Sequence, residues 1–166
     1  GGTGKLPMAN LKALCSKLGL RNVETYIASG NLVFDSDTAP AKIQAQLQQR
    51  LLSYIGKNVG VFLRTDVELR TVLKKNPFSD KEPRLTYVFF LDEKPPADAV
   101  AACRGRAQED LCLGRHEIYV YYPTGMGQSK LQIPAIRFGT ARNMNTVAKL
   151  VEMSARNAAA ASTRVR

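Results

Sequence analysis

Apolar positions in the first half of the chain recur with two different periods. Between residues 7 and 18 they recur every three or four positions, which predicts a helix that ends before Gly19. Residues 23–27 and 32–34 are rich in β-branched and aromatic side chains and flank a Gly-Asn turn, which predicts a hairpin. A second helix is expected to start at residues 37–40, with one apolar stripe from Ile43 to Ile55. The pattern then predicts a strand over residues 59–64 and a short helix that begins with a capping box at residues 65–68.

The second half opens with LTYVFFL at residues 85–91, an apolar run without alternation. Such a run is typical of a central strand that is covered on both faces. Residues 97–103 predict a short helix, and residues 110–113 and 117–122 predict a second hairpin. Two more helices are expected, one over residues 130–138 that Pro134 interrupts and one from residue 145 to about residue 156.

The two halves share one order of elements, in which two strands lie between two helices. This order predicts an α+β fold of two ferredoxin-like (βαββαβ-type) halves that share a core, residues 1–80 and 81–156, with a frayed tail at 157–166. The first half fits that arrangement only if a strand precedes Gly1, because a sheet edge would otherwise stay bare. We therefore expect that an N-terminal strand is missing from this chain.

Composition narrows the functional classes. The 166 residues are 45% hydrophobic and 23% charged, which is ordinary for a globular protein. No apolar run is long enough for a membrane span, and no signal peptide is visible. Three cysteines without CxxC spacing favour reduced thiols and a cytoplasmic location. With one histidine, His116, we expect no metal site and no cofactor.

The net charge of +10 is the strongest compositional signal. Lys and Arg outnumber Asp and Glu in residues 1–80 and 114–166, whereas residues 81–113 are nearly balanced. A basic chain attracts anionic partners, here a nucleic acid or a phosphorylated small molecule. Because no apolar run is long enough to span a bilayer, we expect no membrane partner. The alternative is that the charge serves only solubility.

Four stretches together carry a family resemblance: GKLPMANLKALCSKLGLRNVETYIASGNLVFDS at 4–36, Asn-Pro-Phe at 76–78, GRHEIYVYYPTGMGQSKL at 114–131 and TARNMNTVAKL at 140–150. In this order they resemble the bacterial family named domain of unknown function 1697. The resemblance implies an α+β fold and no established activity. It also implies a hydrophobic strand just ahead of the Gly-Gly, in agreement with the missing strand. Family members commonly have Trp where this chain has Met144.

Polar loops supply the candidate ligand-binding residues. The opening GGTGK is not a P-loop, because Leu6 stands where the Ser or Thr that binds Mg²⁺ should follow Lys5. Backbone N–H groups in such loops can still hold an anion, although the same residues serve equally as tight turns and helix caps. We expect three loops to converge on one anion site formed by Lys5, Gly125, Ser129, Lys130, Arg142, Asn143, Asn145 and Thr146.

Two functions remain open at this stage, beside a purely structural role for these residues. A nucleic-acid binder is favoured by the charge and by Tyr119 and Tyr121, which share one face of a strand and could stack on bases. A small-molecule enzyme that acts on a phosphorylated substrate is favoured by the Gly/Ser/Lys/Asn loops. No catalytic residue stands out, because His116 has no nucleophile in a recognisable motif beside it.

Overall fold

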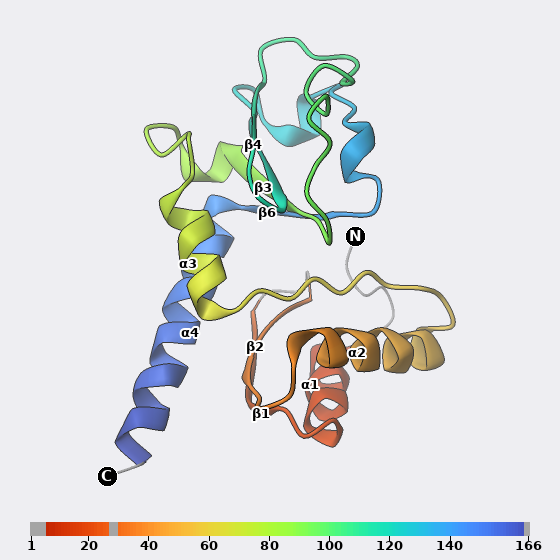
Figure 1. Ribbon diagram of the computed structural model, residues 1–166, viewed down its shortest axis with the longest axis vertical. Coiled ribbons are helices and arrows are strands. Elements are labelled where there is room, and N and C mark those ends of the chain that lie inside the picture. The colour runs from red at the N-terminus through yellow and green to blue at the C-terminus, as the bar shows by residue number, and fades with distance from the viewer. Residues whose placement is uncertain (1–5, 27–29, 165–166) are drawn as a thin grey trace. The chain divides into compact units, whose positions relative to one another are not determined.

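The computed structural model describes residues 6–26 and 30–164 of the chain, with side chains described as far as residue 156 (Figure 1). Its contacts divide the chain into two units, Gly1–Asp66 with Lys149–Arg166, and Val67–Ala148. Among the described residues, no helix combines the length and the apolar character needed to cross a bilayer. The fold is α+β, with helices and two antiparallel sheets.

Residues 6–65 of the first unit contain a two-stranded hairpin and two helices, as the hydrophobic pattern predicts. The strands pair antiparallel from Arg21 opposite Asp35 to Tyr26 opposite Asn31, with an irregularity near Asn22, whose φ is 51°. Gly56 ends the second helix with a φ of 81°, the left-handed conformation that favours glycine. The elements are α1 (Met8–Lys17), β1 (Arg21–Tyr26), β2 (Asn31–Asp35) and α2 (Pro40–Ile55).

The core of this unit lies between the two helices and the hairpin. Leu11 and Cys15 of α1 pack with Leu47 and Leu51 of α2 and with Val23 of β1. Cys15 has no exposed surface, and burial raises the pKa of its thiol to about 11. A thiol in this environment packs as a small apolar group and is unreactive.

The strand predicted over residues 59–64 does not form. The alternation itself is obeyed, because Val59, Val61 and Leu63 all pack against the core. The backbone of this segment pairs with none of the described strands, however, and the Val61 carbonyl accepts a hydrogen bond from the Gln44 side chain at 2.6 Å. Hydrophobic alternation predicts which face of an extended segment is buried, and it does not supply a partner for the backbone.

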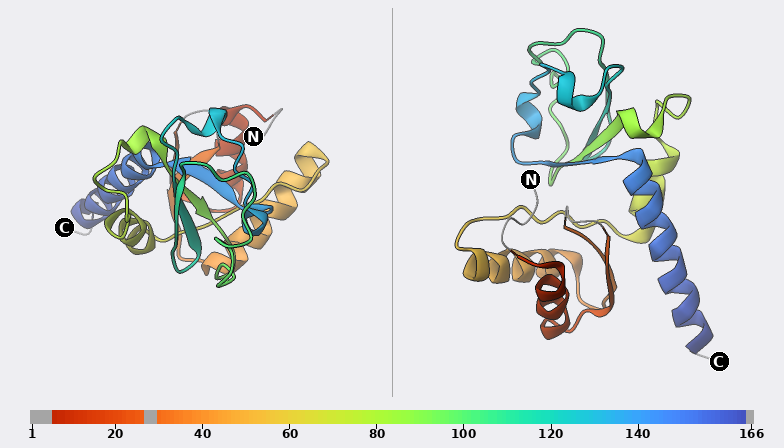
Figure 2. Two further views of the ribbon diagram at one scale, coloured as in Figure 1. Left: turned by 90° about the horizontal axis from the view of Figure 1, so that it is seen from above. Right: turned by 180° about the vertical axis from the view of Figure 1, so that it is seen from behind.

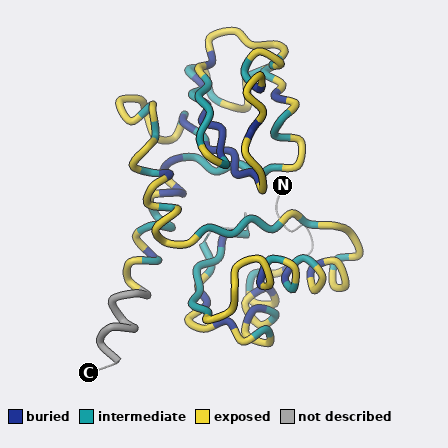
Figure 3. Tube along the Cα trace, in the orientation of Figure 1, coloured by how far each residue is buried: buried dark blue, intermediate teal, exposed yellow. Residues whose placement is uncertain are grey.

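The second unit is built on a four-stranded antiparallel sheet with strand order β4-β5-β3-β6. The predicted central strand is confirmed, because β3 lies between β5 and β6 and is buried almost throughout (Figure 3). The elements that belong to this unit or begin in it are α3 (Asp66–Lys74), η1 (Pro83–Leu85), β3 (Thr86–Phe90), β4 (Asp110–Leu113), β5 (Glu117–Tyr121), η2 (Met126–Gln128), η3 (Pro134–Ile136), β6 (Thr140–Asn143) and α4 (Met144–Arg164).

The two faces of this sheet are covered differently. Phe89 and Ile118 point into an apolar cluster with Ile133 from the loop that follows β5. On the opposite face, the Tyr119 hydroxyl donates to the Val72 carbonyl of α3 at 2.8 Å. Burial on both faces agrees with the continuous apolar run in the sequence.

Two predicted helices are reduced to turns. Residues 97–103 form successive hydrogen-bonded turns, and the chain then leaves them because Arg104 pairs with Gln132 in an isolated bridge. Residues 130–138 keep only the short η3, because Pro134 lacks the N–H of a helix interior and Gln132 is engaged in the bridge. Both segments are too short to hold a helix against these contacts.

The polar stretch before the last helix is a strand, which the sequence pattern did not predict. β6 pairs with β3 along its whole length and leads directly into α4 (Figure 2). α4 itself was predicted, although it runs to Arg164 rather than ending near residue 156. An edge strand of four half-buried residues has no alternating apolar signal to reveal it.

Candidate functional site

The predicted site residues at the start of α4 act first as a helix cap. Asn143 accepts a hydrogen bond through its side-chain oxygen from the Thr146 backbone N–H at 3.0 Å, which is N-cap geometry. Thr146 and Met144 are buried, whereas Asn145 is exposed. Because Met144 is only 3% exposed, this position packs in the interior rather than against a ligand in solvent.

Arg142 lies on β6 beside this cap and is half-buried. Its guanidinium donates to the Thr140 hydroxyl at 2.8 Å and to the Ala141 carbonyl at 2.7 Å. Burial lowers the pKa of Arg142, although a guanidinium stays protonated in proteins. Lys149, one turn into α4, forms an ion pair with Glu152 at 3.5 Å.

The predicted loop at residues 124–130 is tied to an acidic residue that the sequence analysis missed. The Ser129 hydroxyl donates to the Glu109 carboxylate, and that carboxylate also accepts the Ala107 N–H at 2.6 Å. These two hydrogen bonds, the one from Ser129 first, lower the pKa of Glu109. An ionised carboxylate beside Ser129 repels an anion, and the Ser129 hydroxyl is already engaged in the contact between the two loops.

Backbone contacts fasten the same two loops together. Arg104 and Gln132 exchange N–H···O bonds of 3.0 and 2.8 Å. Gly105 adopts a φ of 67°, and a Cβ there would stand 2.3 Å from the Lys130 carbonyl oxygen. Only glycine fits at this position, where the two loops come close together. The Lys130 side chain itself is exposed.

The sheet places the predicted loops at one end but near opposite edges. Tyr121, the last residue of β5, pairs with the first residue of β3, and Asn143 pairs with the second. Asp110 of β4 also pairs with Tyr121, so Glu109 and the attached Ser129 lie at this end. The outer strands β4 and β6 are three strand spacings apart, roughly 14 Å. One ligand would have to span that distance to contact both loops, and Lys5 lies outside the described residues.

The tyrosines of β5 do not form an exposed pair. Tyr119 is 4% exposed, and burial raises the pKa of its hydroxyl. Tyr121 packs against Phe78 with ring centroids 6.3 Å apart and lies 5.6 Å from the Lys81 ammonium. The surface for base stacking that the sequence suggested therefore lacks Tyr119.

A groove that sequence reasoning missed lies in the first unit, between α1 and α2. It has a volume of about 400 Å³. The Asn10 amide at its side donates to the Tyr54 hydroxyl at 2.8 Å. The signal that could have revealed it is charge, because neither helix contains an acidic residue. The lining residues are Asn10, Ala13, Leu14, Lys17, Arg50, Ser53 and Tyr54.

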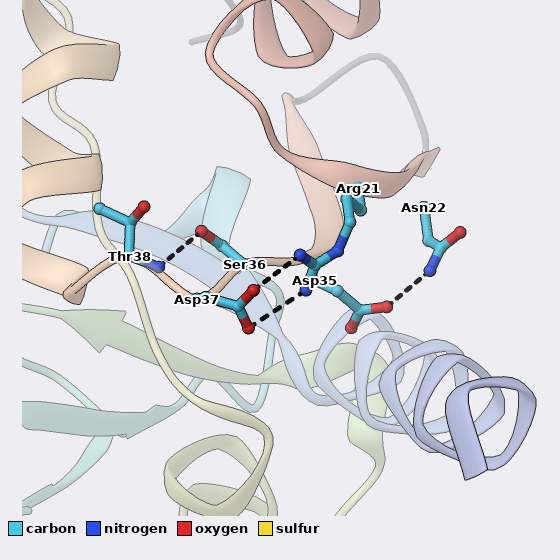
Figure 4. Close-up of polar contacts among 6 residues, drawn as sticks. All are labelled: Arg21, Asn22, Asp35, Ser36, Asp37 and Thr38. Carbon is cyan, nitrogen blue, oxygen red and sulfur yellow. Dashed lines mark hydrogen bonds and ion pairs between the residues drawn. The ribbon is translucent and has the colours of Figure 1, made fainter. Parts of the chain in front are cut away.

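Two carboxylates of the first unit, Asp35 and Asp37, are held by local partners at the hairpin (Figure 4). Asp37 accepts two hydrogen bonds from the Arg21 guanidinium, at 2.8 and 3.3 Å, and Asp35 accepts one from Asn22 at 2.8 Å. The Ser36 hydroxyl accepts the Thr38 N–H at 3.1 Å, just before α2 begins. These two carboxylates are thus engaged by partners outside α1 and α2.

Comparison with known proteins identifies the family. The family described as protein of unknown function (DUF1697) matches residues 1–119. The chain belongs to this family. A solved structure similar to this DUF1697 protein is that of the conserved bacterial protein SP0830 from Streptococcus pneumoniae. The two are 26% identical with a TM-score of 0.75, over 93% of this chain and 92% of that chain. No curated protein sequence matched the DUF1697 chain.

Proposed function

We propose that the protein binds an anionic, phosphate-containing ligand, either a nucleic acid or a nucleotide. The observation that carries this proposal is the segregation of charge in the first unit. α1 and α2 expose Lys12, Lys17, Lys42 and Arg50 and contain no Asp or Glu. In the described part of the chain, none of these four cations forms an ion pair. Unopposed positive charge raises the local concentration of polyanions and speeds their association.

The loop residues that the sequence analysis predicted would form a second surface that contacts the same ligand. Lys130 and Asn145 are exposed and could reach a ligand, whereas Ser129 and Asn143 are engaged by Glu109 and Thr146. The groove between α1 and α2 has better support as a binding site, because Lys17 and Arg50 form no ion pair with the described residues.

Binding of a labelled single-stranded oligonucleotide and of inorganic polyphosphate, measured by anisotropy and by competition, tests the proposal. We expect the affinity for the oligonucleotide to fall with salt, with a log–log slope of about −0.7 per phosphate contact. The double variant Lys17→Gln/Arg50→Gln should bind more weakly and with a shallower slope. Lys94→Gln is the matched control, because Lys94 is an exposed lysine beside Asp92 and Glu93.

The binding data for the variants test the class of ligand and the position of the site separately. If Lys130→Gln/Asn145→Ala loses binding and Lys17→Gln/Arg50→Gln does not, the ligand class stands and the site moves to the loops. If neither anion binds at about 50 mM salt, where phosphate contacts are strong, the proposal is wrong.

A small-molecule enzyme that acts on a phosphorylated substrate is the second candidate. The groove volume of about 400 Å³ favours it, because small-ligand sites fall in this range. The seven lining residues include no carboxylate, imidazole or thiol, so they can bind a phosphate but supply no usual general base. A thermal-shift screen of phosphorylated metabolites, followed by a turnover assay on any that stabilise the protein, tests this candidate.

The proposal also includes a ferredoxin-like topology and a cytoplasmic location. The strand order β4-β5-β3-β6 of the second unit supports a ferredoxin-like half, since it places β5, the third strand of that unit, between its first two. The free thiols Cys15, Cys103 and Cys112 support a reducing, cytoplasmic setting.

A further inference from the structure

We propose that the groove between α1 and α2 binds single-stranded nucleic acid, with a base stacked on Tyr54 and the backbone phosphates held by Lys17 and Arg50. This inference rests on the proposed function and narrows it to one site and one ligand. It draws on three features of the groove: its apolar lining residues, the aromatic ring of Tyr54, and the two cations Lys17 and Arg50.

The groove presents both apolar and polar side chains, as a nucleotide site requires. Ala13 and Leu14 of α1 contribute apolar surface, and Ser53 of α2 adds a hydroxyl. A nucleotide likewise presents an apolar base face beside a polar sugar and a charged phosphate. A volume of about 400 Å³ accommodates a unit of this size rather than a whole duplex.

Tyr54 supplies an exposed and already oriented ring. The residue keeps 55% of its surface accessible although it lies in a helix that packs on the core. The Asn10 amide holds its hydroxyl from the neighbouring helix at 2.8 Å. Because this hydrogen bond restricts the ring before any ligand arrives, less conformational entropy is lost on stacking. Every base has a π face, so such stacking tolerates any sequence.

Lys17 and Arg50 provide the phosphate contacts. They come from different helices and line the same groove, and no carboxylate lies among the seven lining residues. Two like charges that share a groove repel each other in the free protein, and a phosphate between them relieves this repulsion. Arg50 can also donate two parallel hydrogen bonds to phosphate oxygens, which Lys17 cannot.

A single strand fits these features better than a duplex. In a duplex the bases are stacked on one another, so a protein aromatic gains access to them only by unstacking. A basic groove with an aromatic ring is the usual way to bind an exposed single strand without reading its sequence. A duplex of the same length serves as the competitor, because it carries the phosphate charge but does not offer its bases for stacking on Tyr54.

The test measures anisotropy of a labelled single-stranded oligonucleotide with the full chain and its Tyr54→Leu and Tyr54→Phe variants. We expect Tyr54→Leu to weaken binding at least about fivefold without changing the salt slope. Tyr54→Phe keeps the ring and should retain most of the affinity, which also keeps the test valid if Tyr54→Leu is poorly folded. Phe138→Leu is the matched control, since Phe138 is 82% exposed and lies outside the groove.

Phosphate contacts are tested in the same assay by Arg50→Gln, which should reduce the salt slope by about one contact. Polyphosphate has no bases, so its binding should be insensitive to both Tyr54 variants. Unchanged single-strand affinity in Tyr54→Leu, or equal competition by the duplex, overturns the inference. Salt-dependent binding that Lys17→Gln/Arg50→Gln weakens would then leave the broader proposed function standing, whereas absence of all binding removes both.

Discussion

At the residue scale, the most informative group is Glu109, a buried acid whose partners come from two loops. Its carboxylate accepts from the Ser129 hydroxyl and the Ala107 N–H, and Arg106 donates to its backbone carbonyl at 2.9 Å. Sequence reasoning assigned Ser129 to an anion site because Gly, Ser and Lys are common in such loops. The same residue types also build loop crossings, and only the position of Glu109 distinguishes the two roles.

Ser129→Ala should destabilise the protein by about 1 kcal/mol at pH 7, because the ionised carboxylate loses a donor. The pKa of Glu109 is lowered by folding, so its stabilising contribution is present above its ordinary pKa and is lost as the pH falls through the lowered value. The cost of Ser129→Ala should therefore shrink on acidification. Urea unfolding at pH 7 and at about pH 4 checks this, with the exposed Ser79→Ala as control. A cost that grows toward low pH would contradict the assignment.

Gly105→Ala should destabilise the protein by about 2 kcal/mol, because a methyl group would collide with the Lys130 carbonyl oxygen and the positive φ disfavours any side chain. Gly127→Ala is the matched control, since a Cβ there meets nothing within 4 Å. Equal unfolding midpoints for the two variants in urea would show that the loops do not cross as closely as described.

At the element scale, Asn143 determines where α4 begins. Its side chain caps the helix, and the residue also ends β6 opposite Tyr87. Asn143→Ala should cost about 1 kcal/mol, the usual loss for an N-cap, whereas Asn145→Ala should cost far less because Asn145 is exposed. Thermal and urea unfolding of both variants test the difference. Equal losses would mean that either asparagine can cap.

Long segments with a clear period could be predicted from the sequence, and short segments held by contacts could not. α1, α2, the two hairpins and the central β3 follow from apolar spacing and turn residues. The turns at residues 97–103 depend on the Arg104–Gln132 bridge, which no local pattern encodes. β6 is polar, and its pairing with β3 determines its conformation.

The candidate site was harder to predict than the elements. A helix cap among the polar loop residues was anticipated, but the groove joins positions on two helices that lie far apart in the chain, such as Asn10 and Tyr54. A helical stripe predicts the buried side of each helix and leaves the contacts of the exposed side open. The absence of Asp and Glu from both helices can be seen in the sequence, and together with the groove it is the main support for the proposed function.

At the scale of the whole molecule, the charge of +10 works against folding at low ionic strength. Raising salt from about 10 to 150 mM shortens the screening length from about 30 to 8 Å, which weakens repulsion among exposed cations. We expect the Tm to rise by roughly 1–3 °C. The double variant Lys17→Gln/Arg50→Gln should show a smaller salt-dependent rise in Tm than the original chain. In Lys94→Gln the rise should be unchanged, because Lys94 lies beside two acidic residues. Differential scanning calorimetry measures this, and a Tm that falls with salt would contradict it.

The buried Cys15 gives the first unit an internal reporter of its own motion. With no exposed surface and a raised pKa, this thiol can meet an alkylating reagent only when α1 separates from its core. Cys103 and Cys112, in the second unit, are already partly exposed. The slow labelling of one cysteine in the native chain would therefore measure how often the first unit opens. Slowing of that reaction by an added anion would link ligand binding to this unit without any variant or attached label.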